Sequence, residues 1–159
     1  MSSIFPLNFP DNLHNTHILT LKLIRSPNKP TWPNLMDNFV GGAVSEGLTV
    51  LDTAVKEAKE EAGVPWELAQ HLQPAGLVSF FHSTSRGVHP NTEFVFDLDL
   101  PEDFVPLNTD GEVESWRLVP ASELVGLICR PEEFKITSSP VVVDWLVRRG
   151  DTLPRLIVR

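Results

Sequence analysis

The sequence has little cysteine and no cluster of basic residues, and both absences exclude classes of protein. Its 159 residues contain one cysteine, Cys129, which cannot form an internal disulfide. A chain without disulfides is typical of a reducing compartment, so we expect a cytoplasmic location. Lys and Arg number 13 against 21 Asp and Glu, for a formal net charge of -8. Nucleic-acid-binding domains usually carry a basic patch, so we expect no nucleic-acid partner.

Long apolar runs and an N-terminal basic segment are also absent. No apolar stretch approaches the ~20 residues that a helix needs to cross a bilayer, so we expect no membrane partner. The start, Met1 to Pro6, contains no Lys or Arg, unlike a secretory signal or a transit peptide. The length and the 42% hydrophobic content are ordinary for one globular domain. We therefore expect a single domain over residues 1–159, with a short irregular leader at 1–16, acting as a monomer or homodimer.

Apolar periodicity and turn residues predict a mixed α/β (α+β) chain. Strands are predicted where apolar residues alternate or run together, at 17–24, 77–81, 93–100 and 113–119. Helices are predicted at 49–62, 121–127 and 140–149, with a short helical turn at 66–72. The first helix has Thr49 or Asp52 as its cap and Gly63 as its stop. The proline-rich segment 26–34 and the polar segment 82–92 are predicted to be loops.

Three glutamates gather on one face of the predicted 49–62 helix. Residues three and four apart are helix neighbours, so Glu57, Glu60 and Glu61 lie together. The opposite face is apolar and predicted to be buried; it comprises Leu51, Ala54, Val55, Ala58 and Ala62. Three like charges repel one another unless they hold a cation, and hard oxygen ligands suit Mg²⁺ or Mn²⁺. The same lysine- and glutamate-rich segment is also typical of a solvated helix surface.

A glycine pair, Gly41 and Gly42, ends a short apolar run ahead of this helix. Glycine lets a backbone carbonyl approach a metal ion or a phosphate closely, so both residues are candidate metal ligands. The alternative interpretation is an ordinary turn.

Together these features resemble the Nudix box, in which a glycine is followed by a loop and by a helix bearing Arg-Glu, Glu-Glu and a final glycine. The box positions are matched by Gly42, Glu57, Glu60, Glu61, Gly63 and Val64. Two positions depart from the pattern. Leu48 stands where the box has a glutamate, and Lys56 replaces the box arginine, which keeps the charge but loses the guanidinium fork. The resemblance implies a Nudix-type α/β/α sandwich with a mixed sheet and a strand-loop-helix catalytic motif.

Further matches resemble the Nudix branch that processes thiamine diphosphate, which also occurs fused to thiamine pyrophosphokinase in some fungi. They lie at residues 29–33, 36–42, 78–80, 94–101, 110–114, 134–135 and 144–150. The resemblance covers residues 25–150, and we expect the chain to lack the long N-terminal extension that members of that branch usually carry. It implies a hydrolase that converts thiamine diphosphate, or its oxidised or hydroxylated analogues, to the monophosphate and inorganic phosphate.

The resemblance also implies roles for individual residues. Mg²⁺ or Mn²⁺ would be held by the three glutamates and a carbonyl of Gly41 or Gly42, and would lower the pKa of a bound water. The implied catalytic set is Glu57, Glu60, Glu61, Glu112 and Lys56. The general base could be Glu60, Glu61, Glu112 or Glu114, although the segment around Glu112 could equally be a surface strand. Lys56 could brace the glycine loop or contact a phosphate.

Four further residues are candidate substrate contacts. Trp32, in the proline-rich loop, could stack on an aromatic or cationic ring or could simply pack. Arg86, His82 and His89 fall in the predicted polar loop and could touch the leaving phosphate, or could be merely solvated. Cys129 is expected to be a half-buried structural residue.

The same residues bear on three alternative functions. An isopentenyl-diphosphate isomerase would need a cysteine upstream of the box, and none is present. Other diphosphates, such as nucleoside diphosphate derivatives, dinucleotides or prenyl diphosphates, stay open as substrates. A catalytically weak Nudix-fold binding module is the remaining alternative. Retention of all three box glutamates argues against it.

Overall fold

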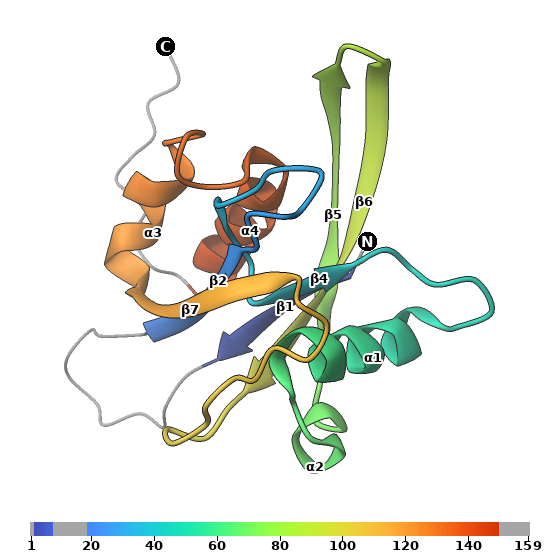
Figure 1. The fold of residues 1–159 in the computed structure, drawn as a ribbon, viewed down its shortest axis with the longest axis vertical. Helices are drawn as coiled ribbons and strands as arrows, with labels where there is room; N and C mark the ends of the chain where they lie inside the picture. The colour runs from blue at the N-terminus through green and yellow to red at the C-terminus, as the bar shows by residue number, and fades with distance from the viewer. Residues whose placement is uncertain (1, 8–18, 150–159) are drawn as a thin grey trace.

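Two β-sheets and their flanking helices make up the fold, which a computed structural model describes for residues 2–7 and 19–149. The strands are β1 (Ser2–Leu7), β2 (Leu19–Arg25), β3 (Met36–Asp37), β4 (Val40–Gly42), β5 (Gln73–Thr84), β6 (Gly87–Asp99) and β7 (Val113–Pro120). The helices are α1 (Val50–Ala62), α2 (Trp66–Ala69), α3 (Ala121–Ile128) and α4 (Ser139–Arg149), with a 3-10 turn, η1, at Ile136–Ser138. Figure 1 shows their arrangement.

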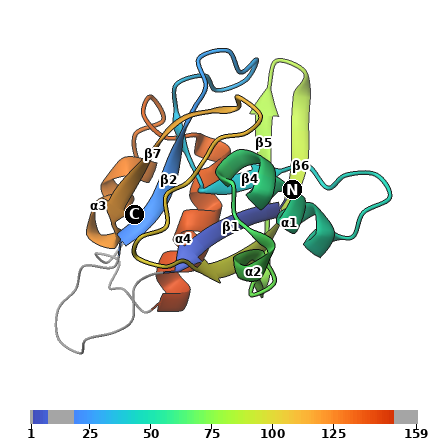
Figure 2. The same cartoon turned by 60° about the horizontal axis from the view of Figure 1, so that its bottom comes forward.

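One sheet is mixed and the other is antiparallel. The four-stranded sheet has the order β4-β1-β6-β5, in which β1 is parallel to β6 and antiparallel to β4. The three-stranded sheet has the order β3-β2-β7 and is antiparallel throughout. Figure 2 shows α1 and α2 on one side of the four-stranded sheet and α4 on the other. The predicted sandwich of helices around a mixed sheet is therefore confirmed.

The N-terminal segment differs from the expected irregular leader. Residues Ser2–Leu7 form β1, which pairs with β4 and β6 inside the larger sheet. The rest of the expected leader, residues 1 and 8–16, and the first two residues of the predicted 17–24 strand lie outside the described residues.

Two apolar clusters lie on opposite faces of β6. Phe96 and Leu98 pack in one cluster, beneath α1 and α2. Val95, which precedes them in sequence, packs in the other cluster with Trp145 of α4. Successive side chains on a strand point to opposite faces, so β6 contributes to both clusters. This double burial fixes the sheet between its two helical layers.

Helix α1 begins and ends where the sequence predicts. The Thr49 side chain accepts a hydrogen bond from the Asp52 N–H, and the Asp52 carboxylate accepts one from the Thr49 N–H, which completes a capping box. Gly63 ends the helix in the left-handed conformation with a φ of 63°. Ala54, Ala58 and Ala62 are buried as expected, and Val55 is partly buried.

Leu51 does not follow the expected apolar face of α1. Its side chain is 46% exposed and lies outside the apolar cluster beneath the helix. The core does reach the first turn, because Thr53 and Ala54 are fully buried, but the buried face of α1 is rotated toward Glu61 and leaves Leu51 at its edge. The prediction that Leu51 is buried was therefore wrong.

The polar segment 82–92 is not a loop. Strands β5 and β6 continue through it as a hairpin, in which His82 lies opposite His89 and Thr84 opposite Gly87. Only Ser85 and Arg86 connect the strands, and Figure 1 shows the hairpin extending beyond the rest of the fold. Solvent reaches both faces of a projecting hairpin, so its strands can be polar without being loops.

Two further expectations concern the exposure of Cys129 and the apolar character of the helices. Cys129 is exposed at the end of α3 and is not half-buried, because it follows the last turn that packs on the core. Within residues 2–7 and 19–149, no helix is long and apolar enough to cross a membrane.

Candidate functional site

A cavity of about 560 Å³ lies where the two sheets, the 3-10 turn η1 and helix α1 meet. Small-molecule sites typically have volumes of about 300 to 1,000 Å³, so this cavity has the size of a ligand site. Its lining includes the segments around β3 and β4, one face of the hairpin, and single residues from α1 and from the β6–β7 connection. The lining residues used below are Arg25, Lys29, Trp32, Asp37, Gly41, Gly42, Glu57, His82, Asn91, Glu112, Lys135 and Ser138.

The glycine pair joins β4 to helix α1. The Gly41 N–H donates to the Glu61 carboxylate at 2.9 Å. A Cβ atom placed on Gly42 would lie 2.3 Å from Cδ of Glu57, so any larger residue would force the Glu57 side chain to move. Gly42 therefore leaves the space in which the Glu57 carboxylate reaches the cavity, with its side chain 15% exposed.

Glu61 is the buried member of the acidic group. It is 4% exposed, and this burial raises its pKa to about 8. The hydrogen bond from Gly41 opposes this rise, and the negative charges of Asp37, Glu57 and Glu112 add to it. Glu61 itself is not among the lining residues of the cavity; it lies beneath the glycine pair, where carboxylates from β3, α1 and the β6–β7 connection affect its ionisation.

Glu60 lies outside the cavity lining. Its carboxylate accepts a 2.7 Å hydrogen bond from Lys56, which also contacts Glu57 at 3.2 Å. The Glu60 side chain is 43% exposed. Lys56 makes ion pairs with these two glutamates, and its expected role in bracing the glycine loop or contacting a phosphate stays a prediction.

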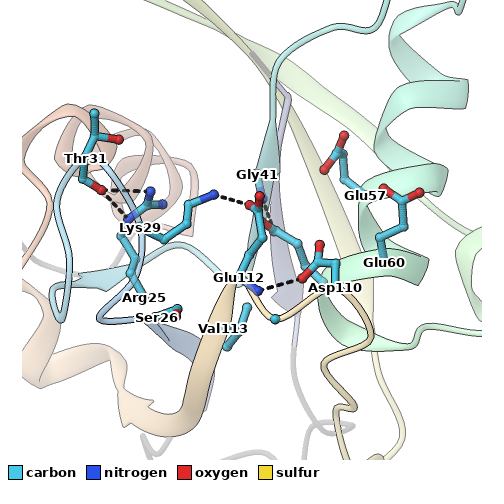
Figure 3. Close-up of polar contacts among 12 residues, drawn as sticks. Arg25, Ser26, Lys29, Thr31, Gly41, Glu57, Glu60, Asp110, Glu112 and Val113 are labelled. Atoms are coloured by element: carbon cyan, nitrogen blue, oxygen red, sulfur yellow. Dashed lines mark hydrogen bonds and ion pairs between the residues drawn. The ribbon is translucent and has the colours of Figure 1, made fainter.

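The connection between β6 and β7 is hydrogen-bonded to the last turn of α1. A few residues farther along the chain, its Glu112 lines the cavity. The Leu107 N–H donates to the Ala62 carbonyl at 3.0 Å, and the Thr109 N–H donates to the Glu60 carbonyl at 3.1 Å. These bonds satisfy carbonyls that a helix end leaves without partners. Glu112 then forms an ion pair with Lys29, as Figure 3 shows, with Glu57 on α1 beyond it.

A buried carboxylate, Asp37, organises the opposite wall. It pairs with Arg25 and Lys135, each at 2.9 Å, and accepts a hydrogen bond from Ser138. Burial would raise the pKa of Asp37, but the charge and hydrogen bond of Lys135, the Ser138 hydroxyl and Arg25 hold it below its ordinary value. Asp37 therefore stays ionised and fixes both cations at the edge of the cavity.

Sequence reasoning missed this wall. Its residues come from the ends of β2 and β3, from η1 and from Lys135 just before it, and only the tertiary structure brings them together. One signal was available: the acidic Asp37 stands in an apolar stretch directly before the glycine pair. An acidic residue in a buried segment usually has a charged partner. The sequence does not indicate which cations those partners are.

The four candidate substrate contacts separate into two groups. Trp32 lines the cavity and is 36% exposed, and Arg25 holds its backbone by donating to the Trp32 carbonyl at 3.1 Å. His82 also lines the cavity, and its Nδ1 is 2.8 Å from the Asn91 amide.

His89 and Arg86 lie farther along the hairpin and are not part of the lining. The His89 ring stacks on His82 with 5.3 Å between centroids, and Arg86 occupies the turn.

The acidic residues fit a divalent cation as a donor set. Glu57 and Glu112 line the cavity, and after burial their charges add to the raised pKa of Glu61, so a cation among these carboxylates would relieve their mutual repulsion. In the described residues no three acidic, His or Cys side chains are already arranged around one point. The carboxylates of Glu112, Glu57 and Glu61 instead contact Lys29, Lys56 and the Gly41 N–H, respectively.

Comparison with known proteins gives matches over most of the chain. A model of the NUDIX domain matches residues 12–144. Nudix hydrolase 24, chloroplastic, of Arabidopsis thaliana is 38% identical over 126 residues, which are 79% of this chain and 34% of that protein. Nudix hydrolase 20, chloroplastic, of the same plant is 38% identical over 130 residues, which are 82% of this chain and 35% of that protein.

The fold is also found among solved structures. The Escherichia coli dihydroneopterin triphosphate pyrophosphohydrolase superposes with a TM-score of 0.64 at 22% identity, covering 92% of this chain and 95% of that one. At this identity the likeness concerns the fold alone. The chain spans about a third of the length of the two plant relatives. The names of both relatives place them in the chloroplast, so a cytoplasmic location for this chain stays a prediction.

Proposed function

Because this chain belongs to the Nudix family, we propose that it is the catalytic domain of a metal-dependent hydrolase of a small organic diphosphate. One observation carries the proposal. The carboxylates of Glu57 and Glu112 enter the same cavity as the cations of Arg25, Lys29 and Lys135. A diphosphate carries several negative charges, so it needs cations on its outer oxygens and a metal ion between its phosphates and the carboxylates.

In the proposed reaction, a water oxygen forms a bond to the terminal phosphorus while the bond from that phosphorus to the bridging oxygen breaks. The products are the monophosphate and inorganic phosphate; one proton of the water passes to a carboxylate and then to solvent, and the other stays on the inorganic phosphate. Bound Mg²⁺ or Mn²⁺ would neutralise phosphate charge and lower the pKa of a coordinated water. Glu57, Glu61 and a carbonyl of Gly41 or Gly42 would hold the ion.

Glu60 and Glu112, the remaining catalytic candidates, would take part in the hydrolysis after their side chains rotate. Glu60 lies one turn from Glu57 on α1 and joins the metal ligands by leaving Lys56, which its 43% exposure permits. Glu112 is the candidate general base, because its side chain is 45% exposed and faces the cavity opposite Glu57. A carboxylate in such a position can accept a proton from an attacking water.

Thiamine diphosphate, or an oxidised or hydroxylated analogue, is the substrate that we propose. The motif resemblance supports it, and so does Trp32 at the mouth of the cavity. The thiazolium ring of thiamine is a cation, and cations are attracted to the face of an indole. Trp32 has a positive φ of 55°, and its carbonyl is bonded by Arg25, so the local backbone is held in a conformation that is rare for a tryptophan.

The test measures phosphate release from thiamine diphosphate, oxo-thiamine diphosphate, ADP-ribose and geranyl diphosphate, with Mg²⁺ and with excess EDTA. We expect a thiamine compound among the best substrates and no turnover in EDTA. Turnover that persists in EDTA would overturn the metal-dependent mechanism. A thiamine compound that ranks below the others would overturn the substrate assignment while leaving the hydrolase proposal in place.

A matched pair of tryptophan variants tests the stacking role. Trp32→Leu should reduce the preference for the charged thiazolium over the neutral oxo analogue by about 5-fold, the scale of an exposed cation–π contact. Trp66→Leu removes a tryptophan of α2 that is 62% exposed and outside the cavity, and should leave the preference unchanged. Equal effects of the two changes would exclude Trp32 as the ring contact.

A further inference from the structure

Among the lysines and arginines that line the cavity, Lys29 differs from the others in its partner. Arg25 and Lys135 both pair with Asp37 on their own wall. Lys29 pairs instead with Glu112, which belongs to the acidic side of the cavity. Both residues line the cavity in which the proposed reaction takes place, and the dashed line in Figure 3 marks the ion pair between them. While it is closed, the pair occupies a cation and a carboxylate that the reaction could use.

The pairs of Asp37 cannot serve as substrate contacts without a large cost. The Asp37 side chain is 9% exposed and has both cations and a hydroxyl as partners. If Lys135 turned toward a ligand, part of the compensation of a buried charge would be lost, which is strongly destabilising. Arg25 is held further by the carbonyls of Thr31 and Trp32. These two cations set the positive potential of the wall but stay in place.

The pair of Lys29 and Glu112 can open. The two side chains are 20% and 45% exposed, so water or a ligand can replace either partner. Their backbones stay together when the pair opens, because the Ser26 N–H donates to the Glu112 carbonyl at 2.9 Å and the Lys29 N–H donates to the Ser26 carbonyl at 3.1 Å. Opening therefore requires rotation of two side chains and no movement of the strands. Exposed ion pairs contribute little to stability, so the opening itself costs little.

We propose that the Lys29–Glu112 pair is a latch that a phosphate of the substrate opens. Lys29 leaves Glu112 and binds an oxygen of the phosphate group, and the released Glu112 carboxylate becomes available to the divalent cation and the attacking water. This inference rests on the proposed hydrolase function. Because one side-chain exchange creates the anion site and frees the carboxylate, phosphate and divalent cation each increase the affinity for the other. By linkage, this mutual effect must be equal in both directions.

The latch makes a prediction that a purely structural ion pair does not. In Lys29→Met the carboxylate is free without substrate, so the affinity for Mn²⁺ alone should rise by ~3- to 10-fold, the scale of a partly exposed ion pair. The affinity for methylenediphosphonate, a diphosphate analogue that cannot be hydrolysed, should fall by about 10-fold, because a charge-assisted hydrogen bond is lost. Lys29→Arg should restore most of the diphosphonate affinity.

Glu112→Gln should give the mirror result. Lys29 is then free, so diphosphonate binding without metal should become tighter by a similar factor while the affinity for Mn²⁺ falls. Arg117→Met is the matched control, because it breaks an exposed ion pair with Glu123 away from the cavity and should change neither affinity. Binding of each ligand is measured by calorimetry, alone and in the presence of the other. Thermal melts verify that every variant is folded.

The outcomes separate the latch from the function on which it rests. Opposite shifts of the two affinities in Lys29→Met, with loss of the coupling between the ligands, support the latch. A parallel fall of both affinities, or no change in either, overturns it, while turnover by the unaltered protein keeps the hydrolase proposal. If the unaltered protein binds no Mn²⁺ and releases phosphate from none of the four diphosphates, both proposals are overturned.

Discussion

Replacing the buried Glu61 by glutamine should stabilise the metal-free protein at alkaline pH and destabilise it at acidic pH. The pKa of Glu61 rises from its ordinary 4.5 to about 8 in the fold, chiefly through burial. Well below pH 4.5 the carboxyl is protonated in both the folded and unfolded states, so it imposes no ionisation cost. As the pH rises toward 8 the unfolded chain ionises first, and stability is lost. Above pH 8 the folded protein carries the whole penalty.

The size of this penalty follows from the shift. At about 1.4 kcal/mol per pH unit, the shift corresponds to roughly 4 to 5 kcal/mol once the carboxylate is fully ionised. The glutamine side chain could still accept the hydrogen bond from the Gly41 N–H, but its own amide N–H groups would be buried without partners. Such a group costs about 1 to 3 kcal/mol at every pH. The variant should therefore be less stable than the unaltered protein at about pH 5 and more stable at about pH 9.

Urea unfolding in EDTA at about pH 5, 7 and 9 measures this directly. The stability difference between the variant and the unaltered protein should change by about 3 to 4 kcal/mol across the series, in favour of glutamine as the pH rises. Other titrating groups are shared by both proteins and cancel in the difference. A stability difference that does not depend on pH would refute the reasoning, because it would show that Glu61 titrates normally in the fold.

Three further changes test the site. Glu57→Gln should lower kcat by about 100-fold, because a charged ligand of the reacting centre is lost, whereas Glu67→Gln on α2 should leave kcat unchanged in the same phosphate-release assay. Gly42→Ala should lower kcat by at least about 10-fold with little change in the urea midpoint, because the new methyl group displaces the flexible Glu57 side chain and not the backbone; an unchanged rate would contradict the assigned contact. Asp37→Asn should lower the free energy of unfolding by about 3 kcal/mol, because two partly buried cations lose their counter-ion, and urea unfolding at about pH 7 would show the loss or its absence.

Local signals predicted both ends of helix α1, while the catalytic roles of its glutamates stay a prediction. The Thr49 and Asp52 capping box and the left-handed Gly63 follow from residue type and spacing, because caps depend on neighbours within one turn. The position of Glu57 beside Gly42 follows from the same motif. These features involve contacts that are short in sequence or that belong to a recognisable pattern.

The cationic half could not be predicted in the same way. The pairing of Lys29 with Glu112 joins residues 83 positions apart, and that of Asp37 with Lys135 joins residues 98 positions apart. No local periodicity carries such information. Glu60 shows a different limit, because helical spacing predicts its face correctly. The direction of its carboxylate depends on competition between Lys56 and a ligand.

The attachment of the β6–β7 connection to the end of α1 divides that connection into two parts with different tolerance to changes in length. Residues 101–106 precede the first bond to the helix, at Leu107, so added or removed residues there would be absorbed before the anchor. Between Thr109 and Glu112 the chain makes a tight turn through Gly111, whose φ is 80°, and the Glu112 N–H is held by the Asp110 carboxylate. One inserted residue there would move Glu112 relative to Glu57. We therefore expect related enzymes of different specificity to vary in length before Leu107 and to keep the spacing after Thr109.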